Sequence, residues 1–264
     1  MTKIRDSVVW LTGASSGIGE HLAYQLAEKG AKLIISARRK EELERVKAQC
    51  NSENVTILTL DLEDSFSLKQ RAKEASTIYG EVDILINNGG ISQRDTILNT
   101  SLEVDRKLME INYFGSITLS KKLLPEMVKR KKGHHVIVTS TVGIINTPFR
   151  SGYGASKHAL HGFYDALRAE HHEDNIKVTI VLPGYIKTNI SYNALVGDGS
   201  QQNKMDPGQE KGMSPEKCAK LIIKAIEANK NELYVGGLKE KMGIYLKRFW
   251  PKAAAKAVRK LRVT

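Results

Sequence analysis

The chain has 264 residues, of which 41% are hydrophobic and 27% are charged, and its formal net charge is +12. This length suits one α/β domain with a sizeable core, and no linker or internal repeat divides the sequence. The charge is uneven, because residues 239–264 hold nine Lys or Arg and one acid and so carry +8 of it. The remainder is only mildly basic, which disfavours a nucleic-acid-binding protein.

The first predicted unit is a strand, a glycine-rich turn and a helix. An apolar run from Ser7 to Thr12 leads into a turn with three glycines, and a helical pattern of apolar residues then continues until Gly30. This order brings backbone N–H groups and a helix N-terminus toward an anion, as in a dinucleotide pyrophosphate site. The predicted cofactor-binding residues of the turn are Gly13, Ser15, Ser16, Gly17, Ile18 and Gly19.

A second predicted strand, residues 32–37, ends in Arg38 and Arg39. An acid at this position would accept hydrogen bonds from the ribose 2′-hydroxyl of NAD, whereas arginines suit the 2′-phosphate of NADP. We therefore expect NADP(H) to be preferred over NAD(H). The alternative is that both arginines only solvate the start of the next predicted helix, residues 40–50.

Two further apolar runs, residues 55–60 and 82–86, predict the third and fourth strands. Ligand contacts in doubly wound sheets gather at the carboxyl ends of strands, so the residues that follow each run are candidates for cofactor binding. Asn and Gly also form ordinary turns, which leaves a purely structural role open for the second cluster. The candidates are Asp61 and Leu62 after the third strand, and Asn88 and Gly89 after the fourth.

The second half of the chain holds the candidate catalytic residues. Ser140 follows a predicted strand at residues 134–139, and Tyr153 and Lys157 lie four residues apart, on one face of a predicted helix. A phenol has a pKa of about 10, and a neighbouring ammonium favours its ionised form. Asn112 falls within a predicted helix over residues 102–131, where an Asn is locally unfavourable unless another group uses its amide.

Taken in chain order, these residues resemble the short-chain dehydrogenase/reductase family over roughly residues 7–236. The resemblance is closest to the branch that contains type 1 11β-hydroxysteroid dehydrogenase and dehydrogenase/reductase members 7 and 7B. It implies a single Rossmann-type domain, an α/β doubly wound parallel sheet of about seven strands flanked by helices. The motifs that carry it are Thr-Gly-x3-Gly-x-Gly from Thr12, Asn-Asn-x-Gly from Asn87, Asn112, Ser140, Tyr153-x3-Lys157 and Pro183-Gly184.

The resemblance also implies a role for each residue. Tyr153 would protonate the substrate oxygen, which Ser140 would hold, and Lys157 would bind the nicotinamide ribose and lower the pKa of the phenol. Asn112 would position a water that links Lys157 to solvent. The residues expected at the nicotinamide end of the cofactor are Pro183, Gly184, Ile186 and Thr188, together with Tyr153 and Lys157.

The predicted function is an NADP(H)-dependent oxidoreductase that interconverts a lipophilic ketone or aldehyde and its alcohol. Two alternatives are an NADP-binding regulatory or scaffold protein without turnover, and an NAD-dependent alcohol dehydrogenase of the same fold. The candidate substrate-binding residues are Ser140, Gln93, Phe149, Tyr185 and Tyr192.

Residues 1–236 are expected to form the catalytic domain, with a mobile substrate lid near residues 189–213, which are rich in glycine and polar residues. Residues 237–264 form a basic extension whose apolar residues recur at helical spacing beyond Pro251. This extension could lie on a membrane surface, cap the domain, or contact another subunit. The family resemblance implies a homodimer or homotetramer.

Neither the cysteines nor the histidines show the spacing of a metal site. Cys50 and Cys218 lie in predicted helices, and the pairs at residues 134–135 and 171–172 lack a completing acidic or Cys cluster. We find no signal peptide and no apolar run long enough to span a bilayer. We therefore expect a cytoplasmic protein without a metal, and any membrane attachment to be peripheral.

Overall fold

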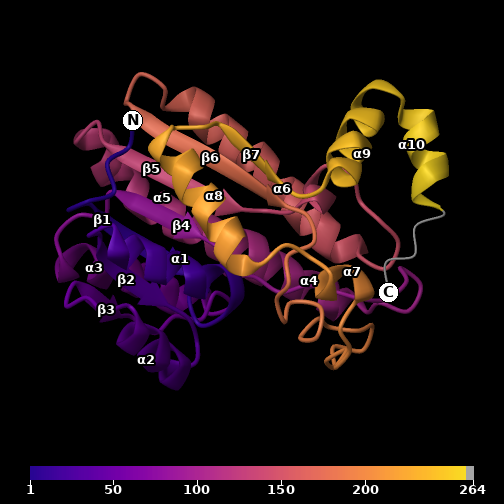
Figure 1. Ribbon diagram of the computed structural model, residues 1–264, viewed down its shortest axis with the longest axis horizontal. Coiled ribbons are helices and arrows are strands. Elements are labelled where there is room, and N and C mark those ends of the chain that lie inside the picture. Colours follow the sequence, from indigo (N-terminus) through magenta and orange to yellow (C-terminus); the bar gives the residue numbers. More distant parts are fainter. Residues whose placement is uncertain (260–264) are drawn as a thin grey trace.

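Seven parallel strands form one sheet in the order β3-β2-β1-β4-β5-β6-β7 (Figure 1). The computed structural model describes residues 1–259, without the side chain of Lys239, so Leu261 and the end of the predicted extension lie outside the described residues. The predicted doubly wound sheet of about seven strands is confirmed. The strands are β1 (Val8–Thr12), β2 (Lys32–Ser36), β3 (Val55–Ile57), β4 (Ile84–Asn87), β5 (Gly133–Val138), β6 (Ile176–Pro183) and β7 (Glu232–Val235).

The strands are apolar along their length because helices cover both faces of the sheet. Side chains alternate between the faces, so that Val9 and Leu11 of β1 pack in one core cluster whereas Val8 and Trp10 pack in the other. All five residues of β1 are buried. A buried parallel sheet therefore explains why these runs are continuous in the sequence.

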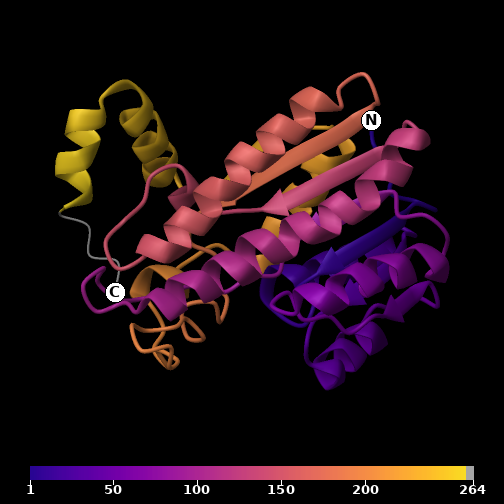
Figure 2. The ribbon, with the colours of Figure 1, turned by 180° about the vertical axis from the view of Figure 1, so that it is seen from behind.

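Helices α1, α2 and α8 supply the core cluster on one face, and α3, α5 and α6 supply the other (Figures 1 and 2). The longest of them is α6, which carries Tyr153 and Lys157. The helices are α1 (Gly17–Glu28), α2 (Lys40–Gln49), α3 (Ser65–Ile78), α4 (Leu102–Met109), α5 (Gly115–Lys129), α6 (Ser151–Glu170), α7 (Pro207–Glu210), α8 (Pro215–Glu227), α9 (Leu238–Phe249) and α10 (Pro251–Val258), with a π-helical turn η1 (Glu110–Phe114) and a 3-10 turn η2 (Thr141–Gly143).

The boundaries of β1, β2, β4 and β5 shift by one or two residues from the sequence prediction, and two predicted elements differ more. Strand β3 ends at Ile57 and not at Leu60, although Leu58 and Leu60 still donate backbone hydrogen bonds to β2 and its following residue. The expected helix over residues 102–131 is interrupted by η1, which contains Asn112. In both places tertiary contacts, and not local propensity, set the hydrogen-bond pattern.

The segment between residues 189 and 213 packs over the carboxyl edge of the sheet. It contains α7, and isolated bridges join Leu195 to Gln93 and Met213 to Ile186. Its Ser191, Asp206 and Gln209 are buried. The segment thus has defined contacts in this structure, and its predicted motion as a lid stays a prediction.

Helices α9 and α10 form a hairpin that extends beyond β7 at one end of the molecule (Figure 1). Cys50 and Cys218 are buried free thiols, and no group of three or more potential metal ligands occurs in residues 1–259. Within the same range, every helix is too short or too polar to cross a membrane.

Strand β5 buries two adjacent histidines that differ in their hydrogen bonds. The ring of His134 contacts Thr2 Oγ1 at 3.0 Å and Thr179 Oγ1 at 2.9 Å. Neither ring nitrogen of His135 has a hydrogen-bond partner in the described part of the chain. Burial lowers the pKa of His134 to about 3 and the pKa of His135 to about 4.

We expect the free energy of unfolding to fall as the pH is lowered from 7 to 4. The unfolded chain protonates histidine near pH 6.5, whereas folded His135 resists until about pH 4, so the unfolded state binds more protons in this window. In His135→Phe, the free energy of unfolding should therefore fall by up to about 3 kcal/mol less between pH 7 and pH 4 than in the native protein. Urea unfolding at several pH values measures the free energy of unfolding of each variant. The control is His172→Phe, because His172 is exposed. An unchanged pH slope in His135→Phe would contradict this assignment.

Candidate active site

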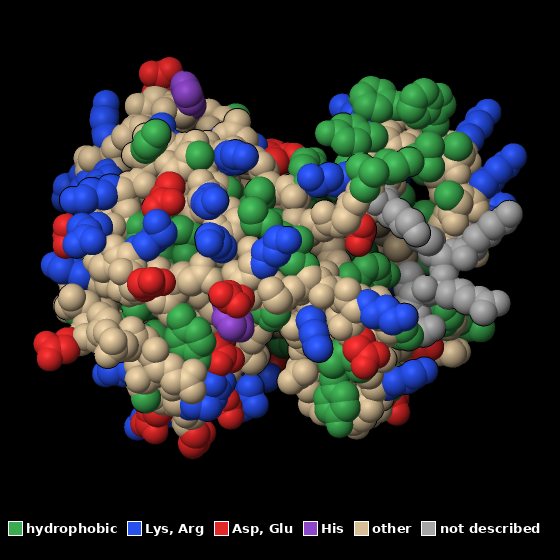
Figure 3. Space-filling model, viewed as in Figure 1, with side chains coloured by type: hydrophobic (Ala, Val, Ile, Leu, Met, Phe, Trp, Pro, Cys, Tyr) green, Lys and Arg blue, Asp and Glu red, His purple; other side chains and the backbone are tan. Residues whose placement is uncertain are grey.

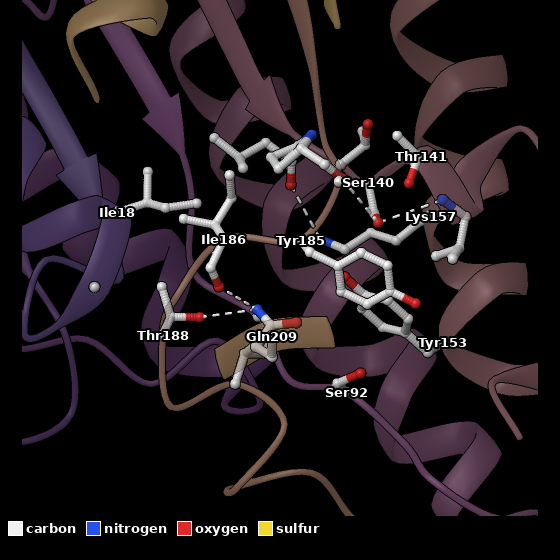
Figure 4. A pocket seen from close by; sticks show the side chains of 18 of the residues that line it. Ile18, Ser92, Ser140, Thr141, Tyr153, Lys157, Tyr185, Ile186, Thr188 and Gln209 are labelled. Atoms are coloured by element: carbon white, nitrogen blue, oxygen red, sulfur yellow. Dashed lines mark hydrogen bonds between the residues drawn. The ribbon is translucent and has the colours of Figure 1, made fainter. Parts of the chain in front are cut away.

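A cavity of about 1150 Å³ opens at the carboxyl edge of the sheet (Figure 4). Its walls are the turn after β1, the residues that follow β4, β5 and β6, and the first turns of α6. Parallel strands all end at this edge, which is where ligands bind in doubly wound sheets. The cavity therefore lies where the sequence predicted the cofactor and the reacting groups.

Glycines allow the turn after β1 to pack against the turn after β4. Gly13 has φ +65°, and a Cβ there would lie 2.6 Å from the Cα of Gly89. A Cβ at Gly19 would lie 2.1 Å from the carbonyl oxygen of Gly13. Gly17 has φ +58° and lines the cavity, where a Cβ would meet Thr188 at 2.9 Å. Larger residues would therefore push the two turns apart or obstruct the cavity.

The start of α1 fits the pyrophosphate of a nicotinamide dinucleotide. Ser15, Ser16, Gly17 and Ile18 line the cavity, and α1 begins at Gly17 with no side chain capping it. The first N–H groups of a helix have no partner within it, and they favour an anion. The turn thus offers backbone donors and space, which is the combination that the sequence predicted.

Asn88 connects this turn to the end of β4, which confirms a structural role for it and leaves its predicted cofactor binding a prediction. Its Nδ2 donates to the carbonyl oxygens of Thr12 and Gly13 at 3.2 and 3.1 Å. Thr12 Oγ1 in turn accepts from the backbone N–H groups of Asn88 and Gly89, both at 3.1 Å. Asn88 and Gly89 also line the cavity, so they both shape the turn and face the ligand space.

Ser140, Tyr153 and Lys157 converge in the cavity (Figure 4). Ser140 follows β5, and its Oγ donates to the carbonyl oxygen of Pro183 at 3.3 Å. The ammonium of Lys157 donates to the carbonyl oxygen of Val138 at 3.0 Å and lies 5.8 Å from the ring centroid of Tyr153. A hydroxyl, a phenol and an ammonium from β5 and α6 thus share one buried site.

Burial opposes ionisation of both groups on α6. It raises the pKa of Tyr153, while the nearby Ser140 hydroxyl and then the charges of Arg94 and Arg150 lower it. Burial lowers the pKa of Lys157 to about 8. Arg94 and Arg150 thus act on the pKa of the phenol, and the lowering that the sequence assigned to Lys157 stays a prediction.

The amide of Asn112 holds the loop after β4 against α6. Its Oδ1 accepts from the N–H of Ile91 at 2.8 Å, and its Nδ2 donates to the Ile91 carbonyl at 3.0 Å and to Ser156 Oγ at 2.9 Å. The prediction that another group uses this amide is therefore confirmed. A Cβ on Gly90 would lie 2.8 Å from Asn112 Oδ1 and 3.5 Å from Lys157 Nζ, so both side chains border the same glycine.

The segment after β6 completes the wall of the cavity. Pro183, Gly184, Ile186 and Thr188 all line it, as the sequence predicted for the nicotinamide end. The side-chain amide of Gln209 in α7 donates to the Ile186 carbonyl, and to Thr188 Oγ1 at 3.3 Å (Figure 4). The lining of this end is thus fixed by a residue of the 189–213 segment.

Five predicted cofactor residues do not line this cavity. Gly19 lets the glycine-rich turn pack closely, and the buried Leu62 packs close to Gly89. Arg38 and Arg39 are exposed at the carboxyl end of β2, and Asp61 follows β3. These last three positions border the half of the sheet edge that an adenosine moiety would occupy in a fold of this kind.

Of the five candidate substrate residues, only Ser140 and Tyr185 line the cavity. Gln93 is fully buried, and its amide donates to the Asp95 carbonyl and to Thr100 Oγ1, so the fold already uses it. Phe149 and Tyr192 are partly exposed outside the cavity lining. Their assignment to the substrate site is therefore corrected, since sequence spacing could not reveal which way these loops turn.

Sequence reasoning missed three charged residues beside the site. Arg94 and Arg150 line the cavity, and both contact the carboxylate of Asp206. Arg94 lies shortly after the Asn-Asn-x-Gly motif that begins at Asn87, so its position could have been noticed in the sequence. Its partner is 112 residues away, and only the folded chain reveals it.

Comparison with known proteins agrees with this geometry. A family model described as short chain dehydrogenase matches residues 7–196. A dehydrogenase/reductase SDR family protein 7-like from Drosophila melanogaster is 45% identical, and the match covers 94% of this chain and 78% of that protein. A dehydrogenase/reductase SDR family member 7B from Xenopus tropicalis is 42% identical, with 98% and 89% covered. The predicted resemblance to members 7 and 7B is confirmed.

Solved structures share the fold. A short-chain dehydrogenase from Streptomyces avermitilis has a TM-score of 0.84 at 28% identity, and 97% of each chain is covered. A short chain dehydrogenase from Burkholderia cenocepacia in complex with NADP has a TM-score of 0.81 at 24% identity, with 97% and 99% covered. The family uses NAD or NADP as cofactor. From its sequence and its site, the chain belongs to the short-chain dehydrogenase/reductase family, a family of oxidoreductases.

Proposed function

We propose that this protein is an NADP(H)-dependent oxidoreductase that interconverts a lipophilic ketone or aldehyde and its alcohol. The observation that carries the proposal is the convergence of Ser140, Tyr153 and Lys157 in one cavity with the glycine-rich turn. Apolar side chains of Val142, Ile145, Ile190 and Leu238 line the same cavity, which suits a lipophilic substrate.

The bound nicotinamide would supply the hydride that reduces the carbonyl carbon. Ser140 Oγ and the Tyr153 hydroxyl, which line the same cavity, would donate to the carbonyl oxygen and stabilise the negative charge that develops on it. Tyr153 would give up its proton to that oxygen. Lys157, whose lowered pKa of about 8 lies close to neutral pH, would favour the resulting phenolate and return a proton to it.

Tyr153→Phe should lower kcat by about 10²-fold to 10⁴-fold, because the proton donor is lost while the ring still fills its place. NADPH binding should persist, since the glycine-rich turn is untouched. A spectrophotometric assay of lipophilic ketones with NADPH, together with a binding titration, measures both. Tyr192→Phe, outside the cavity lining, should change neither value. A protein that binds NADPH but turns over no ketone or alcohol would instead be a regulatory or scaffold protein.

The preference for NADP(H) rests on the charges at the end of β2. Arg38 and Arg39 are exposed there, and neither forms an ion pair within residues 1–259. Nearby Arg45, by contrast, is neutralised by Glu20 at 2.7 Å and Glu42 at 2.9 Å. Two unneutralised guanidinium groups at this position favour a 2′-phosphate.

The double substitution Arg38→Ala, Arg39→Ala should raise the KM for NADPH at least tenfold, because a charge-assisted hydrogen bond contributes about 1.5–3 kcal/mol. The KM for NADH should stay within about twofold. Steady-state kinetics with both cofactors measures the two KM values. Lys47→Ala, which removes an exposed cation from α2, is the matched control. Equal NADH and NADPH affinities in the native protein would favour the NAD-dependent alternative.

We further propose that helix α9 binds the protein peripherally to an anionic membrane surface. Leu238, Met242, Tyr245 and Phe249 recur at helical spacing on α9 and are 60–75% exposed, and Trp250 follows at 64%. Figure 3 shows that apolar side chains gather over this hairpin, with Lys and Arg side chains beside them. An apolar helix face with basic flanks suits the interface of an anionic lipid layer. Leu238 also lines the cavity, so a lipophilic substrate could enter from that side.

Phe249→Ser should reduce binding to vesicles of phosphatidylserine and phosphatidylcholine about tenfold, since a buried Phe contributes roughly 1.5–3 kcal/mol. Vesicle flotation measures the bound fraction. Phe66→Ser removes an exposed phenylalanine from α3 and should not change it. If Phe249→Ser instead abolishes self-association and leaves vesicle binding unchanged, this face is a subunit contact.

A further inference from the structure

A buried ion cluster joins the 189–213 segment to the catalytic cavity. Arg94, Arg150 and Asp206 are 6%, 5% and 2% exposed. The Nε of Arg94 lies 2.8 Å from Oδ2 of Asp206, and Nη2 of Arg150 lies 3.0 Å from the same oxygen. The three residues come from the loop after β4, the N-cap of α6 and the residue before α7. The cluster thus connects three separate parts of the chain beside the reacting groups.

The cluster holds two positive charges and one negative charge. Burial, followed by the charge of Arg150, lowers the pKa of Arg94, although the pairing with Asp206 acts in the opposite direction. A buried charge is costly unless it is paired and hydrogen-bonded, so Asp206 stabilises both guanidinium groups. Among the described residues of the cavity wall, the other ionised candidates are Lys157, also positive, and Glu240, which lies against Gly184 and Gly237.

Arg94 is held in place but keeps unused donors. Its Nη1 donates to Ser92 Oγ and to the Gln93 carbonyl, both at 2.6 Å, and its Nε donates to Asp206. Its Nη2 forms no hydrogen bond with any residue between 1 and 259. Since Arg94 lines the cavity, this nitrogen offers N–H donors to a ligand there. A guanidinium fixed in this way suits a carboxylate or phosphate.

The position of Arg94 relates this site to the reaction. Its charge acts on Tyr153, so an anion bound to it would lie near the group that donates the proton. Ser92 and Tyr185 line the same part of the wall, and the Tyr185 ring lies 5.8 Å from the guanidinium carbon of Arg150. The apolar remainder of the cavity would hold the rest of the substrate.

We propose that Arg94 binds a carboxylate or phosphate group of the substrate, so that the preferred substrates are amphiphiles in which an anionic group and an apolar chain flank the ketone or alcohol. This inference rests on the proposed oxidoreductase function and narrows its substrate class. A carboxylate and a phosphate share the feature that Arg94 would recognise, which is a singly or doubly charged oxyanion within reach of its Nη2.

The test compares matched pairs of long-chain ketones with NADPH: a keto acid with its primary amide, and a keto phosphate with its uncharged alcohol. The native protein should show kcat/KM at least tenfold higher for the anionic member of one pair, and the better pair distinguishes carboxylate from phosphate. Arg94→Gln removes a charge that also acts on Tyr153, so kcat/KM should fall for both ketones, but at least tenfold further for the anionic ketone than for its neutral partner. The control Arg130→Gln also removes an Arg–Asp ion pair, with Asp83, and it should change kcat/KM for neither the anionic nor the neutral ketone.

If Arg94→Gln does not fold, Arg94→Lys takes its place. It keeps the charge but loses the planar guanidinium, so its preference for the anionic over the neutral ketone should be weaker than that of the native protein without being lost. The dissociation constant of the keto acid for NADP-loaded Tyr153→Phe reports binding without turnover. Turnover of neutral ketones without any preference for anions overturns the inference but leaves the oxidoreductase function intact. Equal losses on anionic and neutral ketones in Arg94→Gln would likewise overturn it, because the cluster would then act only on Tyr153 or on the 189–213 segment.

Discussion

The parallel direction of all seven strands is the constraint on which the rest of the structure depends. Because every strand ends at the same edge, residues that lie far apart in sequence meet there. The glycine-rich turn follows β1, Asn88 follows β4, Ser140 follows β5, and Pro183 is the last residue of β6. Helix packing on both faces keeps these ends in register, so the site is a consequence of the way the core is buried.

Close backbone approach gives that edge its shape. The contact between Gly13 and Gly89 leaves no room for a side chain, and Asn88 spans the same two turns with its amide. The π-helical turn at Asn112 serves a similar purpose, because it directs an amide to Ile91 and to Ser156 of α6. Turns that would be mobile in isolation are thereby held by buried hydrogen bonds.

Burial also sets the electrostatics of the site. Tyr153 and Lys157 are almost inaccessible to solvent, and each is shifted toward its neutral form. The Arg94, Arg150 and Asp206 cluster places buried charges close to this pair. In a medium of low polarity such charges act over several ångströms, so they bear on both proton transfer and the choice of ligand.

The candidate catalytic residues and most cofactor residues were predictable, because each lies in a local motif of fixed spacing. Gln93, Phe149 and Tyr192 were not, because the direction of a loop depends on contacts with distant residues. The carboxyl end of β3 and the interruption at Asn112 were missed for the same reason. Arg94 was visible in the sequence as one cation among many, and nothing local distinguished it.

The sequence by itself determined the alternation of strands and helices, the glycine-rich turn and the Tyr153 and Lys157 pair, since these depend on residue type and short-range periodicity. The tertiary structure decided which side chains line the cavity, and it brought Asp206 to Arg94 and Arg150. It also selected the charges that act on Tyr153. The physical reason is that burial and pairing over long sequence separations arise only when the sheet and its covering helices pack together.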